Sequence, residues 1–366
     1  MIISKNDKLV EFLRTLTEFS RTPNCSTVVS RIEFIEGKGI CFCFGENIDR
    51  VFIKNKNVDF TRYVEGDIFV TAILAELSVD DVEIKYDQET SNVILNNKFS
   101  FNSFILNRNF NDSIVEDSDI FFSKEQWDSL TEDFKFTLGC CFTNPKTADT
   151  IGFANNQGTL YKLLPGTSAY VIDKFDASVN ETSMSQNYGH SSNIWLMPRK
   201  VYDLICSMNE STVYIRFEDD NIKIETENMF LIYKTTYMGY GCFKRRLSLI
   251  STEANNLIDI TLLKELISNV KNLVGFCFEN GEDKNLQLNI ANGLATISIE
   301  ELSTKIKIDQ TSDALKFCAN FNFVSYIIDK LSSNAVIIDS SCNEEDIYLI
   351  KDGDRNIFFN KIDYLD

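Results

Sequence analysis

Histidine is almost absent from this chain of 366 residues, which has only His190. A single histidine in a polar segment argues against histidine-based acid–base catalysis. The sequence also lacks GxSxG, HExxH, a phosphate-binding glycine loop and a dinucleotide-binding glycine pattern. The acidic pairs Asp80/Asp81 and Asp219/Asp220 fall at predicted turns, where carboxylates are usually solvated. The chain is therefore predicted to have no catalytic residues, no enzymatic activity and no cofactor.

Long apolar runs are missing as well. No segment reaches the roughly 18–20 apolar residues that a membrane helix needs. The first residues, MIISKNDKLVEF, carry charges too early for a secretory signal. There are only four prolines and no low-complexity tract, and 44% of the residues are hydrophobic, which is enough to form a core. A folded cytoplasmic protein without membrane contact is expected.

The ten cysteines include no CxxC pair and none of the pair-plus-pair spacings typical of zinc sites. Cys41 and Cys43 would simply point to one face of an alternating strand. Reduced, mostly buried thiols and no metal site are expected from this pattern.

Basic residues are outnumbered, with 36 Lys and Arg against 54 Asp and Glu, giving a net charge of −18. Nucleic-acid binding normally leaves a basic footprint, so the location of the charge matters more than its sum. The helices predicted below carry no net charge together, and the whole excess therefore lies on the remaining residues.

One pattern occurs three times along the chain: a short helix followed by strands with alternating apolar residues. The helices are predicted over 69–78, 198–208 and 323–333, and an acidic residue lies near the end of each: Glu76, Asp203 and Asp329. The near-equal spacing of these residues indicates a repeat, although three unrelated α+β domains with similar turns would give a similar pattern.

Each repeat has a first half that also begins with a helix, predicted over 5–21, 124–135 and 261–273. Ser123 and Thr261 are candidate N-caps, and Gly37 and Gly39 suit a hairpin turn. Two helices against an antiparallel sheet make each repeat an α+β unit. The predicted domains are residues 1–119, 120–248 (with a polar insert at 174–193) and 249–366.

The sequence resembles the bacterial-type DNA sliding clamp, the β subunit of replicative DNA polymerase III. The resemblance spans nearly the whole chain and is clearest at 193–208 (NIWLMPRKVYDLICSM), 241–250 (GCFKRRLSLI, similar to the family's linker) and 319–333 (ANFNFVSYIIDKLSS). It implies three clamp domains per chain, a head-to-tail homodimeric ring around duplex DNA, and tethering of the replicative polymerase. The Asn-, Ile-, Lys- and Phe-rich composition further suggests a phage or mobile element with an AT-rich genome.

In that family the helices line the hole. A near-neutral lining inside an acidic shell favours weak, sequence-independent contact with phosphates, which permits sliding. For any single residue, a solvated surface side chain is the alternative. The candidate DNA-binding residues are Lys5, Lys8, Arg14, Arg21, Lys124, Lys146, Arg199, Lys200, Lys264, Lys271 and Lys330.

By the same resemblance, peptides of the polymerase and clamp loader bind an apolar pocket between the second and third repeats. The sequence departs from the family in the turn at 165–169 and in the C-terminal tail, where partner specificity would be decided. One of Phe358 and Phe359 is expected to face the core. The candidate pocket residues are Leu164, Gly166, Ser168, Ala169, Gly241, Arg245, Phe358, Phe359, Asn360 and Ile362.

The resemblance also implies that the first domain's edge strand joins the third domain of a second copy. The residues concerned are Phe99 and Phe101 on one side, with Asn272 and Leu273 on the other. Exposed aromatic residues on a strand edge favour use as an interface. The alternative is a clamp-like monomer that binds DNA on one face or captures clamp partners without forming a ring.

Overall fold

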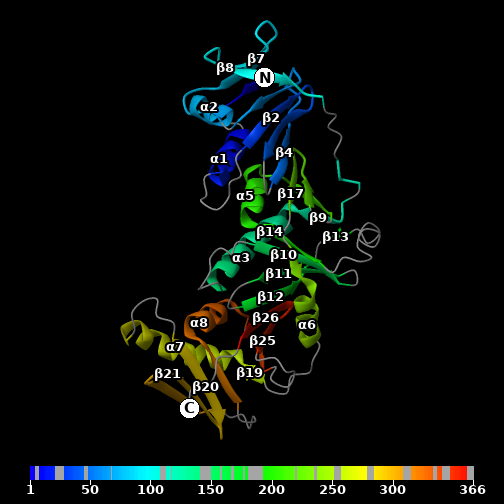
Figure 1. Cartoon of the computed structure of the whole chain (residues 1–366). Coiled ribbons are helices and arrows are strands. Elements are labelled where there is room, and N and C mark those ends of the chain that lie inside the picture. The colour runs from blue at the N-terminus through cyan, green and yellow to red at the C-terminus, as the bar shows by residue number, and fades with distance from the viewer. Residues whose placement is uncertain are drawn as a thin grey trace. The chain divides into compact units, whose positions relative to one another are not determined.

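The structure is a computed structural model. It describes residues 1–4, 8–20, 29–44, 48–66, 68–107, 113–116, 118–140, 150–156, 159–165, 169–175, 178–179, 193–218, 221–234, 237–250, 257–277, 284–307, 315–332, 336–339 and 347–360. Helices lie against antiparallel sheets, as Figure 1 shows. The predicted α+β class is confirmed. The insert at 174–193, with His190, lies largely outside the described residues.

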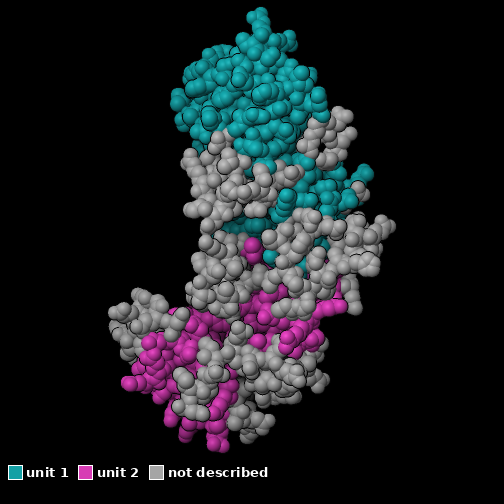
Figure 2. Space-filling view, viewed as in Figure 1, with its two compact units in different colours: residues 1–131, 176–238 teal, residues 132–175, 239–366 magenta. Residues whose placement is uncertain are grey.

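The chain forms two compact units (Figure 2). Unit 1 comprises residues 1–131 and 176–238, and unit 2 comprises residues 132–175 and 239–366. Each unit contains strands from two of the predicted repeats, because a shared sheet continues from one repeat into the next. The division into three domains at residues 119 and 248 therefore stays a prediction from the repeat.

The helices of unit 1 agree with the predicted ones. They are α1 (Lys8–Ser20), α2 (Ile68–Leu77) and α5 (Arg199–Ser207), while α3 (Lys124–Cys140) begins in unit 1 and ends in unit 2. The predicted stripe of α1 is buried, with Leu9 4% exposed and Phe12 and Leu16 fully buried. Apolar residues three and four positions apart thus place one face of α1 against the core.

Unit 1 is built on one long antiparallel sheet of thirteen strands among the described residues. In sheet order they are β1 (Ile2–Ile3), β6 (Val82–Asp87), β7 (Asn92–Leu95), β8 (Phe99–Ile105), β5 (Arg62–Glu65), β2 (Val29–Ile35), β3 (Gly39–Phe44), β4 (Ile48–Lys54), β17 (Met229–Lys234), β16 (Asn221–Glu225), β15 (Thr212–Phe217), β9 (Ile120–Ser123) and β13 (Ser178–Val179).

The first and middle repeats meet in this sheet where β4 pairs with β17, from Met229 opposite Ile53 to Tyr233 opposite Ile48. Lys54 Nζ donates to Glu225 Oε1 at 2.7 Å across the junction. The other oxygen of Glu225 accepts a hydrogen bond from the backbone N–H of Ile114 at 2.7 Å. Glu225 is only 3% exposed, so its charge is compensated inside the junction.

The hairpin between β2 and β3 depends on its two glycines, as predicted. Gly37 has φ +68° and Gly39 has φ +154°, values that residues other than glycine rarely adopt. A Cβ at Gly39 would lie 2.0 Å from the carbonyl oxygen of Ile53. Only glycine allows β3 to approach β4 this closely.

Unit 2 contains two further antiparallel arrays. One runs β10 (Thr150–Asn156), β11 (Thr159–Pro165), β12 (Ala169–Lys174), β26 (Arg355–Asn360), β25 (Ile347–Asp352), β24 (Val336–Asp339) and β19 (Leu257–Asp259). The other runs β22 (Leu302–Lys307), β21 (Leu294–Ile299), β20 (Asn285–Ala291) and β23 (Leu315–Asn320). Two more strands, β14 (Asn193–Pro198) and the short β18 (Tyr237–Gly239), complete the described strands.

The remaining helices are α6 (Tyr240–Ile250), α7 (Ile260–Cys277) and α8 (Phe321–Lys330). By family resemblance, 241–250 was expected to be similar to a linker. In the structure this segment is helical, with Phe243 fully buried and Leu249 nearly so. The predicted cap of α3 is confirmed, because Ser123 Oγ accepts from the N–H of Gln126 at 3.3 Å. Thr261 does not precede its helix as expected, since α7 already begins at Ile260.

Candidate nucleic-acid and partner interfaces

Seven of the eleven candidate DNA-binding side chains are described: Arg14, Lys124, Arg199, Lys200, Lys264, Lys271 and Lys330. Lys5, Arg21 and Lys146 lie outside the described residues, and Lys8 is described only as the start of α1. All seven lie on helices α1, α3, α5, α7 and α8.

Four of these cations face a carboxylate. The distances are 3.7 Å for Arg14 and Glu11, 3.4 Å for Lys124 and Asp128, 3.5 Å for Arg199 and Asp203, and 2.8 Å for Lys271 and Asp329. The first three pairs are one helical turn apart. All are at least about one-third exposed, so water and salt screen them. These helix faces thus present cations whose charge is already partly compensated.

Lys264 and Lys330 have different surroundings. Lys264 Nζ donates to the carbonyl oxygen of Leu331 at 2.7 Å, which ties α7 to the end of α8. Lys330 is exposed in the last turn of α8. The hydrogen bond and the charge of Lys135 lower the pKa of Glu132, and the charge of Lys330 adds a smaller effect in the same direction. Lys264 therefore has a structural contact of its own, whereas Lys330 is presented to solvent.

The candidate partner residues gather where β12 pairs with β26. Tyr170 lies directly opposite Phe358, and Ala169 lies opposite Phe359. Side chains that face each other across a pair of strands share one side of the sheet. On this side the guanidinium of Arg246 lies 4.3 Å from the ring centre of Tyr170 and 5.9 Å from that of Phe358.

Phe359 points to the other side of the sheet. Its ring lies 5.3 Å from those of Phe323 and Tyr348 and 5.9 Å from that of Phe317. The two neighbouring phenylalanines thus face opposite sides, as alternation along a strand requires. Both are almost fully buried, at 1% and 3% exposed.

Leu164 and Ala169 are buried within this sheet, whereas Arg245 is exposed on α6. Gly166, Ser168 and Ile362 lie outside the described residues, and Gly241 and Asn360 are described by their backbones alone. Tyr170 and Arg246 are not among the pocket residues that the family resemblance implied. Each is adjacent to a selected residue, and helical turning of α6 decides which arginine faces β12.

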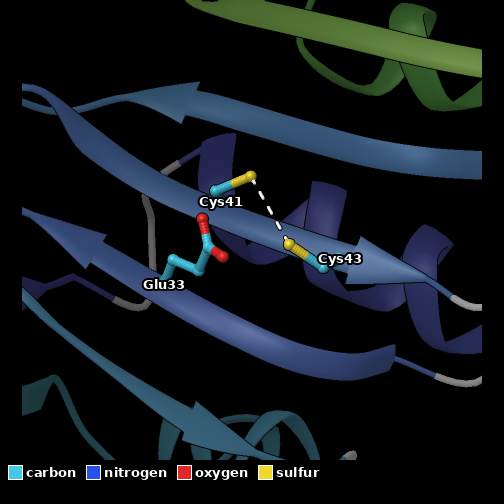
Figure 3. Close-up of side chains that lie close together, drawn as sticks. All are labelled: Glu33, Cys41 and Cys43. Atoms are coloured by element: carbon cyan, nitrogen blue, oxygen red, sulfur yellow. Dashed lines mark hydrogen bonds between the residues drawn. The ribbon is translucent and has the colours of Figure 1, made fainter. Parts of the chain in front are cut away.

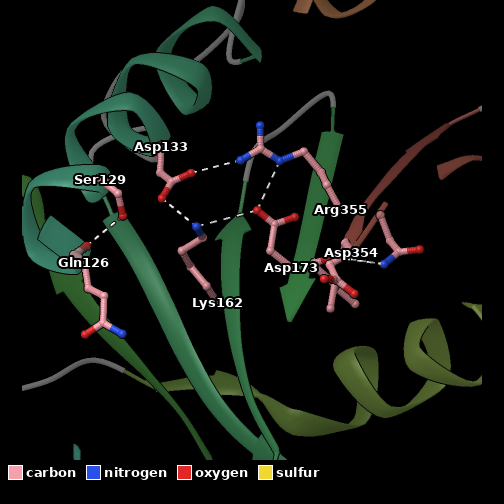
Figure 4. Close-up of polar contacts among 9 residues, drawn as sticks. Gln126, Ser129, Asp133, Lys162, Asp173, Asp354 and Arg355 are labelled. Atoms are coloured by element: carbon pink, nitrogen blue, oxygen red, sulfur yellow. Dashed lines mark hydrogen bonds and ion pairs between the residues drawn. The ribbon is translucent and has the colours of Figure 1, made fainter. Parts of the chain in front are cut away.

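A buried ion-pair network, which the sequence did not reveal, lies in unit 2 (Figure 4). Lys162 Nζ lies 2.6 Å from Asp133 Oδ2 and 3.6 Å from Asp173 Oδ2. Arg355 donates to Asp133 Oδ1 and to Asp173 Oδ2, both at 3.1 Å. Asp133 is 3% exposed, so its charge is neutralised in the interior and does not add to the exposed acidic charge of α3.

Two opposing effects set the pKa values in this network. Burial raises the pKa of Asp173, although Arg355 and Lys162 act against the rise. At Arg355, burial alone would lower the pKa, but Asp173 and Asp133 outweigh it and raise the pKa. Arg355 therefore stays charged, whereas burial disfavours the charged form of Asp173.

The candidate ring-closing residues differ in their surroundings. Phe99 is 44% exposed on β8, whereas the ring of Phe101 lies 4.8 Å from that of Phe69 in an edge-to-face contact. Asn272 and Leu273 fall within α7, and their side chains lie outside the described part. Helix α7 packs against β22, which ends its sheet and pairs only with β21 among the described strands.

No protein-family model matches the sequence, and no curated protein matches it. Solved structures match over the full length. The DNA polymerase III β subunit of Caulobacter crescentus has a TM-score of 0.66 at 11% identity, with 99% of both chains covered. The sliding clamp of Bacillus subtilis has a TM-score of 0.64 at 14% identity, covering 100% of this chain and 99% of its own.

A sliding clamp of Pseudomonas aeruginosa bound to griselimycin has a TM-score of 0.63 at 12% identity, with 100% of this chain and 99% of that chain covered. The chain therefore has the fold of the bacterial DNA polymerase III β subunits. None of the described helices is long and apolar enough to cross a membrane.

Proposed function

We propose that this chain is a DNA sliding clamp, a non-enzymatic ring subunit that encircles duplex DNA and tethers a replicative polymerase to it. The observation that carries the proposal is the likeness in fold to bacterial polymerase III β subunits, which extends over 99–100% of this chain and 99% of theirs. Such a protein needs no covalent chemistry. It must enclose DNA, slide along it and hold a partner.

The charges on the helices support sliding. A clamp requires attraction to phosphates without contacts to base edges, because base contacts would fix its position. Arg14, Lys124 and Arg199 are partly compensated by acidic neighbours on their own helices. Contact with DNA through such pairs is weak, independent of sequence and sensitive to salt.

Partner peptides of a polymerase and a clamp loader bind, in this proposal, beside Tyr170, Arg246 and Phe358. Arg246, which lies over the buried rings of Tyr170 and Phe358, would be the polar anchor of this surface. Arg is enriched in the centres of interfaces. The griselimycin-bound clamp shares this fold, which makes griselimycin a suitable probe for the surface.

Ring closure would join β8 of one copy to the α7 and β22 region of another. Each copy then offers one end of the contact, and a head-to-tail contact that closes gives a ring. Light scattering on a sizing column should give the mass of two 41.9 kDa chains. A chain that stays monomeric at high concentration would contradict the ring and favour a clamp-like monomer.

The variant Phe99→Asp should shift the mass to that of one chain, because it places a charge at the contact. Val79→Asp is the matched control: Val79 is 77% exposed, lies beyond the end of α2 and is on no strand. An equal effect of both substitutions would indicate a general loss of folding and would count against β8 as the contact.

A further inference from the structure

Glu33 on β2 and Cys41 and Cys43 on β3 form a cluster on one side of the long sheet of unit 1 (Figure 3). Glu33 is the direct cross-strand partner of Cys41, and Arg31 is that of Cys43. Residues two apart on a strand share a face, so these four side chains lie together. Glu33 and Cys41 are fully buried, and Cys43 is 9% exposed.

The walls of this cluster are mainly apolar, with Ile35, Phe52, Ile114, Phe230 and Ile232 in the same cluster as the two thiols. Arg50 on β4, the direct cross-strand partner of Cys43, adds a cation beside Arg31. Oε1 of Glu33 forms an ion pair with Arg31 Nη2 at 2.6 Å, whereas Oε2 has no hydrogen-bond partner. A buried carboxylate oxygen without a donor is rare in proteins, and a bound ion is one recognised reason for it.

The ligand atoms have the spacing of a metal site. The sulfur atoms of Cys41 and Cys43 lie 3.9 Å apart. Two thiolates bound at about 2.3 Å to a tetrahedral zinc ion lie about 3.8 Å from each other. One carboxylate oxygen of Glu33 and both sulfurs lie within 4.8 Å of one another, so small rotations of the side chains bring all three to bonding distance.

Zinc binds thiolates, so both thiols lose their protons when the ion enters. Two protons leave and two positive charges enter, so the net charge inside the sheet does not change.

We propose that Glu33, Cys41 and Cys43 bind one zinc ion, with two thiolates, one Glu33 oxygen and a water molecule as ligands. Thiolates favour zinc over calcium or magnesium, which take oxygen ligands. Arg31 retains its contact with the other oxygen of Glu33 and orients the carboxylate, as outer partners of metal ligands do. The 9% exposure of Cys43 marks the side from which the ion enters. The proposal does not depend on the sliding-clamp function.

Purified full-length protein, reduced and freed of metal with a chelator, provides the test. Titration with zinc against a chromophoric chelator should show one tightly bound equivalent per chain. Cobalt should give a thiolate-to-metal charge-transfer band. In the same wild-type sample, zinc should protect Cys41 and Cys43 from alkylation, as mapped by mass spectrometry, and this needs no variant to fold.

Substitution then assigns the ligands. The double variant Cys41→Ser/Cys43→Ser should no longer bind the zinc equivalent tightly and should lose the cobalt charge-transfer band. Glu33→Gln should bind zinc at least about 10-fold more weakly, since loss even of an outer partner of a ligand costs about 10–100-fold. Cys206→Ser is the control, because Cys206 is a free, half-buried cysteine on α5. Wild-type protein that binds no zinc, or zinc that leaves Cys41 and Cys43 open to alkylation, would overturn the proposal.

Discussion

Asp173 and Arg355 are paired twice in this structure. Their Cα atoms are direct partners across β12 and β26, and Arg355 Nε donates to Asp173 Oδ2 at 3.1 Å. Three residues along the same two strands, Tyr170 lies opposite Phe358. The ion pair and the proposed partner surface therefore share one pair of strands, and the network around Asp173 holds the register on which that surface depends.

Removing one cation from this network should destabilise unit 2. Lys162→Met leaves Asp133 and Asp173 buried with Arg355 as their common partner, and breaking a buried ion pair costs about 3–5 kcal/mol. Urea unfolding measures the loss. Lys135→Ala, on the helix that carries Asp133, is the control, because the pair of Lys135 with Glu132 is exposed and should contribute little. Equal losses in the two variants would contradict the network's role.

The pH dependence of stability should carry a contribution from Asp173. Burial raises its pKa, so the folded state binds this proton more tightly than the unfolded state does. That contribution is fully present below the ordinary aspartate pKa and is lost as the pH rises through the raised value. The difference in unfolding free energy between wild type and Asp173→Asn should fall across this window. Urea unfolding at several pH values tests it, and a difference that grows with pH would be the opposite of what is expected.

Arg246 and Arg245 offer a matched comparison at the partner surface. Arg246 lies over the rings of Tyr170 and Phe358, whereas Arg245 is exposed. Arg246→Ala should weaken binding of griselimycin about 10-fold, since truncation of a central interface residue commonly costs more than about 1 kcal/mol. Arg245→Ala should change it little. Calorimetry compares the two; equal losses, or no binding by the wild type, would place the partner surface elsewhere.

Removing an acidic neighbour should strengthen contact with DNA. Asp203→Asn frees Arg199, whose guanidinium lies 3.5 Å from the Asp203 carboxylate. Affinity for a duplex should rise roughly two- to fivefold, as expected for an exposed charge pair of ~0.5–1 kcal/mol. The slope of log affinity against log salt should steepen by about 0.9 if one more phosphate is contacted. Fluorescence anisotropy measures both, with Glu301→Gln, in the exposed turn before β22, as control. An unchanged slope would remove Arg199 from the lining.

The helices could be predicted because their signals are local. The stripe of α1 needs only Leu9, Phe12 and Leu16 at helical spacing, and the cap of α3 needs only Ser123 and Gln126 three residues apart. Helix α6 was not predicted, because the segment was interpreted by its resemblance to a linker. The spacing of its buried residues Phe243 and Leu249 was not used.

The sites could be predicted less well, because they depend on register between distant strands. Glu33 faces Cys41 only through the pairing of β2 with β3, and Arg355 reaches Asp133 over 222 residues of sequence. Neither relationship has a spacing that a search for CxxC or for acidic pairs could detect. Arg246 lies over Tyr170 and its neighbour Arg245 does not, because a helix turns by about 100° per residue.

The pairing of β4 with β17 has a mechanical consequence. Two repeats joined by adjacent antiparallel strands cannot swing apart without breaking a row of backbone hydrogen bonds together with the buried contact of Lys54 and Glu225. The same holds for β12 and β26 in the other unit. Such joints are stiff in the way that the interior of a sheet is stiff. Neither seam should therefore act as a flexible hinge, and a pulling force would have to shear a whole row of hydrogen bonds before either one opened.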